Sequence, residues 1–266
     1  MTKLNPMIGQ SMTANEYADE WQQNASVFSA SGDYTWMSAQ LGDAKKIIEI
    51  GCGSGDSTEA LLKDGRQVLA IESNQSCAKI TSERLRAKGY SVEEISIDQL
   101  ANLASWEDSG VKLLIADFLS EEIKQLLPAG HFNAIVCWLT GTYADYVAKA
   151  LKKPLLQFQG SEMATYRMKI QQKCYELGVH ALDHDGIVQI VDRAFVRSWD
   201  DKDFAKSEFA KQQSQVSGQK YKISQNDCAV RNLTNGLAHS NIQYIAKIPA
   251  GSNGIAILTS SRAKLA

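Results

Sequence analysis

The sequence lacks the cysteine patterns that would indicate a metal site or a disulfide framework. Its five cysteines form an odd count, no two of them have CxxC spacing, and they stand at Cys52, Cys77, Cys137, Cys174 and Cys228. A free thiol inside a strand or helix packs as a small apolar side chain. We therefore expect a reduced, intracellular protein with neither a zinc site nor a structural disulfide.

Long apolar runs are missing as well. No stretch reaches the roughly 20 apolar residues that a membrane-spanning helix requires. Residues 1–17 also contain no continuous apolar segment of the kind found in signal peptides. These absences predict a cytoplasmic protein that does not interact with a membrane.

Neither sign of charge is in clear excess. Charged residues make up 22% of the 266 residues, and the net charge is −2. Basic residues gather only in pairs such as Lys45-Lys46 and Lys152-Lys153, so the chain offers no extended basic surface to a nucleic acid. The length suits one large α/β domain with insertions.

The most informative stretch is 45–59, which has the sequence KKIIEIGCGSGDSTE. An apolar, β-branched run ends at Gly51, Gly53 and Gly55, and helix-start residues follow from Asp56. A buried strand, a glycine turn and a helix start in direct succession are typical of the ligand-binding corner of a doubly wound α/β sheet.

Two common phosphate-binding motifs do not fit this corner. The dinucleotide fingerprint G-x-G-x-x-G requires glycine at position 56, where this chain has Asp56. A carboxylate at the helix N-terminus opposes a pyrophosphate there. A Walker loop requires lysine and then serine or threonine after its last glycine, and neither residue is present.

The second apolar strand, 67–71, leads into an acid. Glu72 lies 17 residues after Gly55. A carboxylate at the end of this strand can accept hydrogen bonds from both hydroxyls of a ribose. The same acid occurs in dinucleotide enzymes, so it indicates a ribose without identifying the cofactor. A solvated strand-end glutamate is the open alternative.

The stretch 49–55 resembles motif I of the class I S-adenosylmethionine-dependent methyltransferases, which is an acid followed by x-G-x-G-x-G. Glu49 and the three glycines fill every specified position. The resemblance covers residues 43–260 and implies an α/β/α sandwich with a doubly wound, mostly parallel seven-stranded sheet. It also implies an antiparallel C-terminal hairpin strand, which we place at 241–248 and 254–259.

The resemblance implies S-adenosyl-L-methionine as cofactor and S-adenosyl-L-homocysteine as product. In this family, an acid after the third strand bonds the adenine amino group beside an apolar side chain, and Asp117 and Phe118 match that pair. Asp117 could instead cap the following helix. The cofactor-binding residues that we expect are Glu49, Gly51, Cys52, Gly53, Gly55, Glu72, Ser73, Asp117, Phe118, Cys137 and Trp138.

The fourth strand, 132–139, argues against two subclasses. It lacks the N/D-P-P-Y/F motif of many enzymes that methylate amines or amides, and Cys137 and Trp138 cannot bind magnesium. His180 and His184 are four residues apart, and such a pair is a weak signal for a metal site without other ligands. We therefore expect a turn at 180–186 and no metal.

The segment before motif I is rich in aromatic residues. Thr13 and Glu16 form a capping-box pattern that predicts a helix start. In the resembled family such aromatics can cover the cofactor and substrate, but Tyr17, Trp21, Tyr34 and Trp36 could equally pack onto the sheet. We predict a helical cover over 1–42 and an S-adenosylmethionine-binding domain over 43–266. Weaker candidates for substrate binding are Tyr34, Trp36, Thr140 and Tyr143.

These observations predict methyl transfer to an unidentified acceptor, which we expect to be a small molecule rather than a protein or nucleic acid. Displacement at a sulfonium methyl requires alignment and exclusion of water, and it needs a base only if the acceptor must lose a proton. The sequence does not rank the possible bases, which are His131, His180, His184, His239 and Tyr143. The alternative is a protein that binds the cofactor without catalysis.

Overall fold

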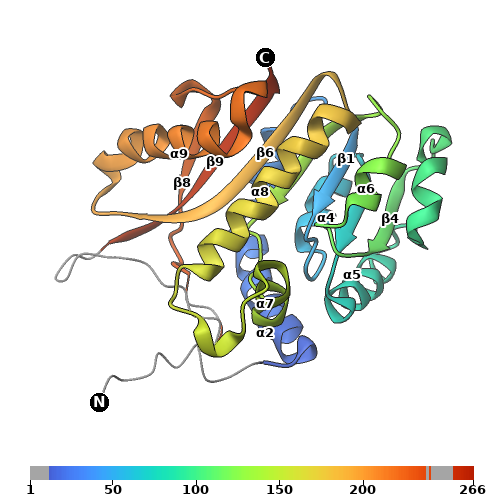
Figure 1. The fold of residues 1–266 in the computed structure, drawn as a ribbon, viewed down its shortest axis with the longest axis horizontal. Helices are drawn as coiled ribbons and strands as arrows, with labels where there is room; N and C mark the ends of the chain where they lie inside the picture. The colour runs from blue at the N-terminus through green and yellow to red at the C-terminus, as the bar shows by residue number, and fades with distance from the viewer. Residues whose placement is uncertain (1–11, 238–239, 241–253) are drawn as a thin grey trace.

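The structure is a computed structural model that describes residues 12–237, 240 and 254–266. A central sheet carries helices on both faces (Figure 1). Its strands are β1 (Lys46–Ile50), β2 (Gln67–Glu72), β3 (Val92–Ile95), β4 (Gly110–Ile115), β5 (Phe132–Trp138), β6 (Leu182–Val196), β7 (Tyr221–Lys222), β8 (Cys228–Asn232) and β9 (Ile255–Leu265).

The strand order is β3-β4-β2-β1-β5-β6-β9-β7, and β8 also pairs with β9. Strands β1 to β6 are mutually parallel, whereas β9 runs antiparallel to β6, β7 and β8. The predicted fold class is therefore confirmed, including the antiparallel strand near the C-terminus.

Within the described residues the sheet has nine strands, two more than the seven that were predicted. Strand β3 extends the sheet beyond β4, and two short strands, β7 and β8, share β9 as their partner. Of the expected terminal hairpin, the segment 254–259 lies mostly within β9, and 241–248 lies outside the described residues.

The α-helices are α2 (Ala14–Ala30), α3 (Asp33–Ala39), α4 (Asp56–Lys63), α5 (Gln75–Ala87), α6 (Glu121–Leu126), α7 (Ala144–Leu151), α8 (Glu162–Ala181) and α9 (Lys202–Ser217). Short 3-10 turns are η1 (Ile97–Ser105), η2 (Leu155–Gln157), η3 (Trp199–Asp201), η4 (Gly218–Lys220) and η5 (Gln225–Asp227). None of the helices among the described residues is both long and apolar enough to span a membrane.

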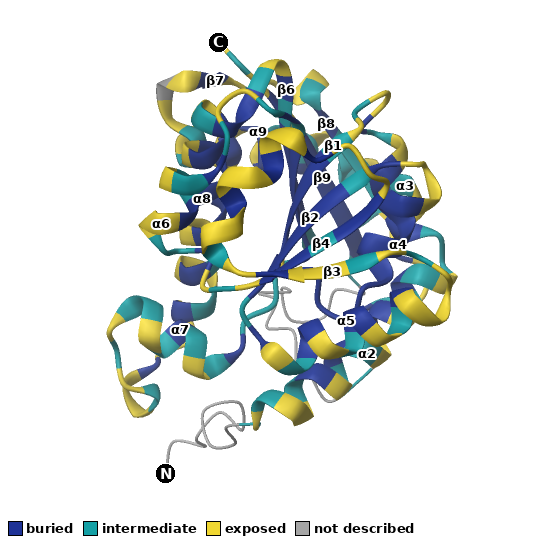
Figure 2. Cartoon of the chain, turned by 90° about the vertical axis from the view of Figure 1, so that its right-hand side faces the viewer, coloured by how far each residue is buried: buried dark blue, intermediate teal, exposed yellow. Residues whose placement is uncertain are grey.

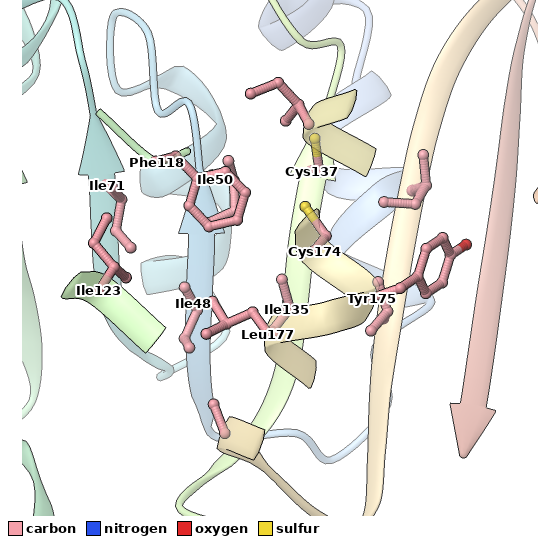
Figure 3. Close-up of a cluster of buried hydrophobic side chains, with 14 of the residues drawn as sticks. Ile48, Ile50, Ile71, Phe118, Ile123, Ile135, Cys137, Cys174, Tyr175 and Leu177 are labelled. Atoms are coloured by element: carbon pink, nitrogen blue, oxygen red, sulfur yellow. The ribbon is translucent and has the colours of Figure 1, made fainter. Parts of the chain in front are cut away.

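The core is divided by the sheet into two apolar layers. Successive residues of a strand point to opposite faces, so Ile48 packs toward α6, α8 and α9, while Ile47 packs toward α2, α3, α4 and α5. Figure 3 shows the first layer, where Leu177 of α8 lies against Ile48 and Ile135. Figure 2 shows that the strands are mostly buried between helices with exposed outer faces.

The predicted N-terminal helix start is confirmed. Glu16 N donates to Thr13 Oγ1 at 3.2 Å, and Thr13 N donates to a Glu16 carboxylate oxygen at 2.7 Å. Helices α2 and α3 share one apolar layer with α4, through side chains such as Phe28, Met37 and Leu61. The division of the chain at residues 42 and 43 stays a prediction.

Candidate functional site

A hollow of about 670 Å³, partly open to solvent, lies where parallel strands end. Its floor comes from the residues that end or follow β1, β2, β4 and β5. Ligands of open α/β sheets bind at the carboxyl ends of the strands. At this hollow the rings of Tyr17 in α2 and of Tyr143, the residue before α7, are 5.3 Å apart.

The glycine turn has a backbone that side chains would strain. The φ angles of Gly51, Gly53 and Gly55 are 76°, 56° and 81°, in the left-handed region that glycine adopts without a Cβ clash. A Cβ at Gly53 would lie 2.2 Å from Trp21 Nε1. Glycine is therefore required here both for the turn and for the close approach of the indole.

Glu49 does not line the hollow. It is 1% exposed and accepts hydrogen bonds from Ser57 Oγ at 2.5 Å and Thr58 Oγ1 at 2.6 Å. Burial raises the pKa of Glu49 to about 7. The first residue of the motif therefore ties the end of β1 to the first turn of α4, which holds the glycine turn between them.

Glu49→Gln is expected to change how stability depends on pH. The native carboxyl keeps its proton up to pH about 7, whereas the unfolded one loses it near ~4.3. Raising the pH between these values therefore destabilises the wild type, by up to about 3 kcal/mol. Urea unfolding from pH 5 to 8 should show Glu49→Gln gaining stability relative to wild type as pH rises. A pH-independent difference between Glu49→Gln and wild type would contradict the prediction.

Glu72 lines the hollow and is 8% exposed. Its two carboxylate oxygens accept hydrogen bonds from Gly53 N at 3.0 Å and from Asn74 N at 2.8 Å. Burial raises the pKa of Glu72, although these backbone donors oppose the shift. The acid therefore fixes the glycine turn to the end of β2, and each oxygen keeps a lone pair for a ligand.

Asp117 and Phe118 also line the hollow. Asp117 accepts a hydrogen bond from Leu119 N at 3.1 Å and pairs with Lys149 Nζ at 3.2 Å. The N-cap of α6 is Ser120, so Asp117 supports the turn before that helix rather than capping it. The ion pair with Lys149 is largely exposed and contributes little, so a ligand amino group can replace it.

Eight of the predicted residues meet at the hollow and seven do not. Those that line it are Gly51, Gly53, Glu72, Ser73, Asp117, Phe118, Thr140 and Tyr143. Those that lie outside it are Glu49, Cys52, Gly55, Cys137, Trp138, Tyr34 and Trp36.

The end of β5 explains two of these differences. Cys137 points into the layer under α8, where its sulfur lies near that of Cys174 (Figure 3). Trp138 points to the other face, where its indole donates to Gln189 Oε1 at 2.9 Å and stacks on Tyr34. Both side chains are thus core residues, and β5 reaches the hollow only through the segment after it, at Thr140.

Three more of the residues outside the hollow pack in or against the core. The Cys52 thiol lies 3.6 Å from Thr81 Oγ1. Tyr34 is 4% exposed, and Trp36 packs at the edge of the same layer with the Arg231 guanidinium over its ring. Packing onto the sheet therefore describes Tyr34 and Trp36.

Helix α2 supplies the cover. Tyr17 and Trp21 line the hollow, Thr142 N donates to Tyr17 Oη at 3.0 Å, and Asn74 Nδ2 donates to Ala14 O at 3.0 Å. Tyr17 and Trp21 therefore lie over the hollow, and their role as a cover of cofactor and substrate stays a prediction. Their helical spacing signalled a shared face but not what that face would contact.

Two lining tyrosines were missed by the sequence reasoning. Tyr146 of α7 donates to Ser73 O at 2.9 Å, and Tyr166 projects from α8. Tyr166 belongs to the apolar stripe of its helix, so periodicity indicated burial but gave no sign that the hollow was its neighbour.

The hollow is acidic and aromatic. Glu72 and Asp117 are its charged residues, and no lysine, arginine or histidine is among the described residues that line it. Asp56 lies elsewhere, buried beside Ser54 Oγ at 2.8 Å and Arg84 at 2.7 Å. Because Arg84 compensates its charge, the case against a pyrophosphate rests on the acids of the hollow rather than on Asp56.

The histidines that the structure describes are far from this end of the sheet in the topology. His131 precedes β5 and lies 3.1 Å from Lys46 Nζ, His180 contacts Leu127 O at 2.8 Å, and His184 is exposed in the first part of β6. The segment 180–186 passes from α8 directly into β6 rather than forming a turn, and no metal-binding cluster occurs within the described ranges. His239 lies outside them.

Among the candidate bases that the structure describes, Tyr143 alone lines the hollow. Its hydroxyl donates to an Asp145 carboxylate oxygen at 2.8 Å. Burial and the neighbouring carboxylate raise the pKa of Tyr143 to about 12. A tyrosine in this state does not act as a base near neutral pH.

No protein-family model and no curated protein matches the chain. Among solved structures, geranyl diphosphate C-methyltransferase from Streptomyces coelicolor A3(2) is 12% identical with a TM-score of 0.47, covering 87% of this chain and 78% of that one. A putative methyltransferase from Bacillus halodurans C-125 is 10% identical with a TM-score of 0.46, covering 87% and 97%. A tRNA (m1A58) methyltransferase from Aquifex aeolicus is 13% identical with a TM-score of 0.43, covering 87% and 68%. These scores are low, so the fold assignment rests on the strand order of the chain itself.

Proposed function

We propose that the protein binds S-adenosyl-L-methionine and transfers its methyl group to a small-molecule acceptor, releasing S-adenosyl-L-homocysteine. The observation that carries the proposal is the meeting of the glycine turn, Glu72 and Asp117 in one acidic hollow. Glu72 can accept hydrogen bonds from the ribose hydroxyls, and Asp117 can accept one from the adenine amino group.

The charge of the hollow favours this cofactor over a dinucleotide. A sulfonium is a cation, and cations bind well beside carboxylates and over aromatic faces. Tyr17, Trp21 and Tyr143 supply such faces. A dinucleotide would place two phosphate charges near Glu72, where none of the described lining residues carries a positive charge.

The cover formed by α2 supports a small acceptor. Tyr17 and Trp21 lie over part of the hollow beside the glycine turn, and α2 is fixed at its start by Asn74 and Ser76. A cover of this kind reduces the access of water to the sulfonium, which favours methyl transfer. A large polymer would have to displace this cover.

The binding step is tested by thermal unfolding with S-adenosylhomocysteine or NAD⁺. We expect S-adenosylhomocysteine at about 100 times its Kd to raise Tm by roughly 5–10 °C, because it stabilises the native state alone. NAD⁺ at the same concentration should not raise Tm. Stabilisation by NAD⁺ without stabilisation by S-adenosylhomocysteine would overturn the proposal.

A cofactor-binding protein without catalysis is the second candidate. It is favoured by one observation, namely that Tyr143 is the one candidate base lining the hollow among the described residues and its pKa is raised. Transfer of labelled methyl from S-adenosylmethionine into a metabolite extract separates the two. Labelled product establishes the enzyme, whereas tight binding of S-adenosylhomocysteine without labelled product supports the second candidate.

A further inference from the structure

A second hollow adjoins the first on the side of Asp117. Ser73, Asp117, Tyr146 and Tyr166 line both hollows, so these residues stand at their junction. Thr140, Tyr17 and Tyr143 line the first hollow but not the second. The junction is therefore on the strand β4 side, away from the segment that follows β5.

Two hydroxyls at this junction, Ser73 Oγ and Tyr166 Oη, form no hydrogen bond with the described residues, and Tyr166 is the more buried of the two residues. The side chain is 8% exposed, yet none of the described residues forms a hydrogen bond with Tyr166 Oη. The neighbouring Tyr146, in contrast, donates to Ser73 O at 2.9 Å. Tyr166 Oη is not among the buried atoms that lack a partner, so this oxygen is accessible from the hollows that Tyr166 lines, and a ligand atom there can pair with it.

The surroundings of Tyr166 make its hydroxyl a donor. Burial and the carboxylates of Asp117 and Glu72 raise the pKa of Tyr166, so the proton stays on the oxygen at neutral pH. A ligand atom that pairs with it is therefore an acceptor. Asp117, at the same junction, offers acceptor oxygens instead.

We infer that Tyr166 Oη donates a hydrogen bond to a ring nitrogen of adenine in the bound nucleoside. This nitrogen lies beside the adenine amino group, which donates a hydrogen bond to Asp117. The inference rests on the proposed function. A donor and an acceptor side by side match an adenine edge, because its amino group lies between the ring nitrogens N1 and N7, both acceptors. Hypoxanthine has an oxygen in place of that amino group. It would therefore place an acceptor against the acceptor oxygens of Asp117, and no hydrogen bond would form there.

The first test compares binding of S-adenosylhomocysteine by calorimetry to wild type, Tyr166→Phe and Tyr221→Phe. Tyr221 is a matched buried tyrosine outside both hollows, and its hydroxyl donates to Tyr175 O at 3.0 Å. We expect Tyr166→Phe to bind about 5–10-fold more weakly with an unchanged Tm of the free protein, because no protein hydrogen bond is lost. Tyr221→Phe should show the reverse, with a lowered Tm and unchanged affinity.

The second test identifies the ligand atom. S-adenosylhomocysteine analogues with carbon in place of N1, N3 or N7 are bound to wild type and to Tyr166→Phe. Wild type should lose about 5–10-fold for either the N1 or the N7 analogue and little for the N3 analogue. Tyr166→Phe should not lose affinity again for that same analogue, because the partner of the nitrogen is already absent.

The outcomes separate the inference from the proposed function. If S-adenosylhomocysteine does not bind wild type, the proposed function fails. If it binds wild type and Tyr166→Phe equally, Tyr166 has no role at the base and the inference is wrong. The inference is also wrong if the losses from Tyr166→Phe and from each analogue simply add, since Tyr166 then acts elsewhere.

Discussion

Gly53→Val is expected to abolish binding of S-adenosylhomocysteine, with a loss of more than about 100-fold, and to destabilise the fold by about 1–3 kcal/mol. The stability loss follows from the φ of 56° at Gly53, which a β-branched residue adopts only with strain. The binding loss follows from position. A Cβ there would lie 2.2 Å from Trp21 Nε1, so the indole must move and the new side chain enters the hollow.

Gly65→Val is the matched control for this prediction. Gly65 also has a left-handed φ, of 71°, but a Cβ there meets nothing within 4 Å. It therefore introduces similar backbone strain without an obstruction. Calorimetry should show that Gly65→Val binds S-adenosylhomocysteine like wild type although its Tm is lowered. Equal binding by Gly53→Val and Gly65→Val would show that the glycine turn is not part of the ligand site.

A second pair of variants separates the indole from the ligand. Gly53→Ala should lower the free energy of unfolding less in a Trp21→Ala protein than in wild type. The reason is that Trp21→Ala removes the indole whose Nε1 would lie 2.2 Å from the new Cβ. The strain at φ 56° remains in both. Urea unfolding of the four variants of this cycle measures the coupling, and a coupling of zero would mean that α2 yields freely.

Local sequence patterns predicted the glycine corner well, because strand, turn and helix start follow each other directly along the chain. The strand-end position indicated Glu72, and the family resemblance indicated Asp117. Both line the hollow, because the carboxyl ends of parallel strands meet at one edge. Glu49 shows the limit of this reasoning. It fills a position of the motif, but two hydroxyls of α4 satisfy it, and no spacing rule distinguishes such a structural carboxylate from one that contacts a ligand.

The side chains at the end of β5 could not be placed from sequence. Cys137 and Trp138 stand at the end of a strand, but the side to which each points depends on where the strand ends, and Trp138 finds its partner Gln189 in β6. That aromatic residues of α2 and α8 line the hollow could not be predicted, because it depends on how these helices pack onto the sheet. Strand β8 was missed because most of its residues are only half-buried, so the chain shows no alternation there.

Glu72→Ala is expected to weaken binding of S-adenosylhomocysteine by about 1.5–3 kcal/mol, which is the scale of hydrogen bonds to a charged group. Two effects contribute. The variant removes the acceptor for the ribose hydroxyls, and it also releases Gly53 N and Asn74 N, which the carboxylate now holds at 3.0 Å and 2.8 Å. The free protein should therefore lose stability in urea as well.

An analogue of S-adenosylhomocysteine without the ribose 2′-hydroxyl separates the two effects. Wild type should bind this analogue more weakly than the natural ligand, because one hydrogen bond to the carboxylate is missing. Glu72→Ala should bind both alike, since its carboxylate is already absent. If wild type does not distinguish them, Glu72 holds only the glycine turn, and the ribose lies elsewhere.

The pH dependence of binding gives an independent readout of the same carboxylate. Burial raises the pKa of Glu72, so on acidification the site takes up its proton at a higher pH than an ordinary glutamate, near ~4.3, would. The protonated form loses the charge that strengthens the bonds to ribose. Affinity for S-adenosylhomocysteine should thus be constant above the raised pKa and fall below it in wild type. Glu72→Ala lacks the titrating group, so this fall should be absent, and a wild-type affinity that is constant down to pH 4.5 would place the ionised carboxylate outside the binding equilibrium.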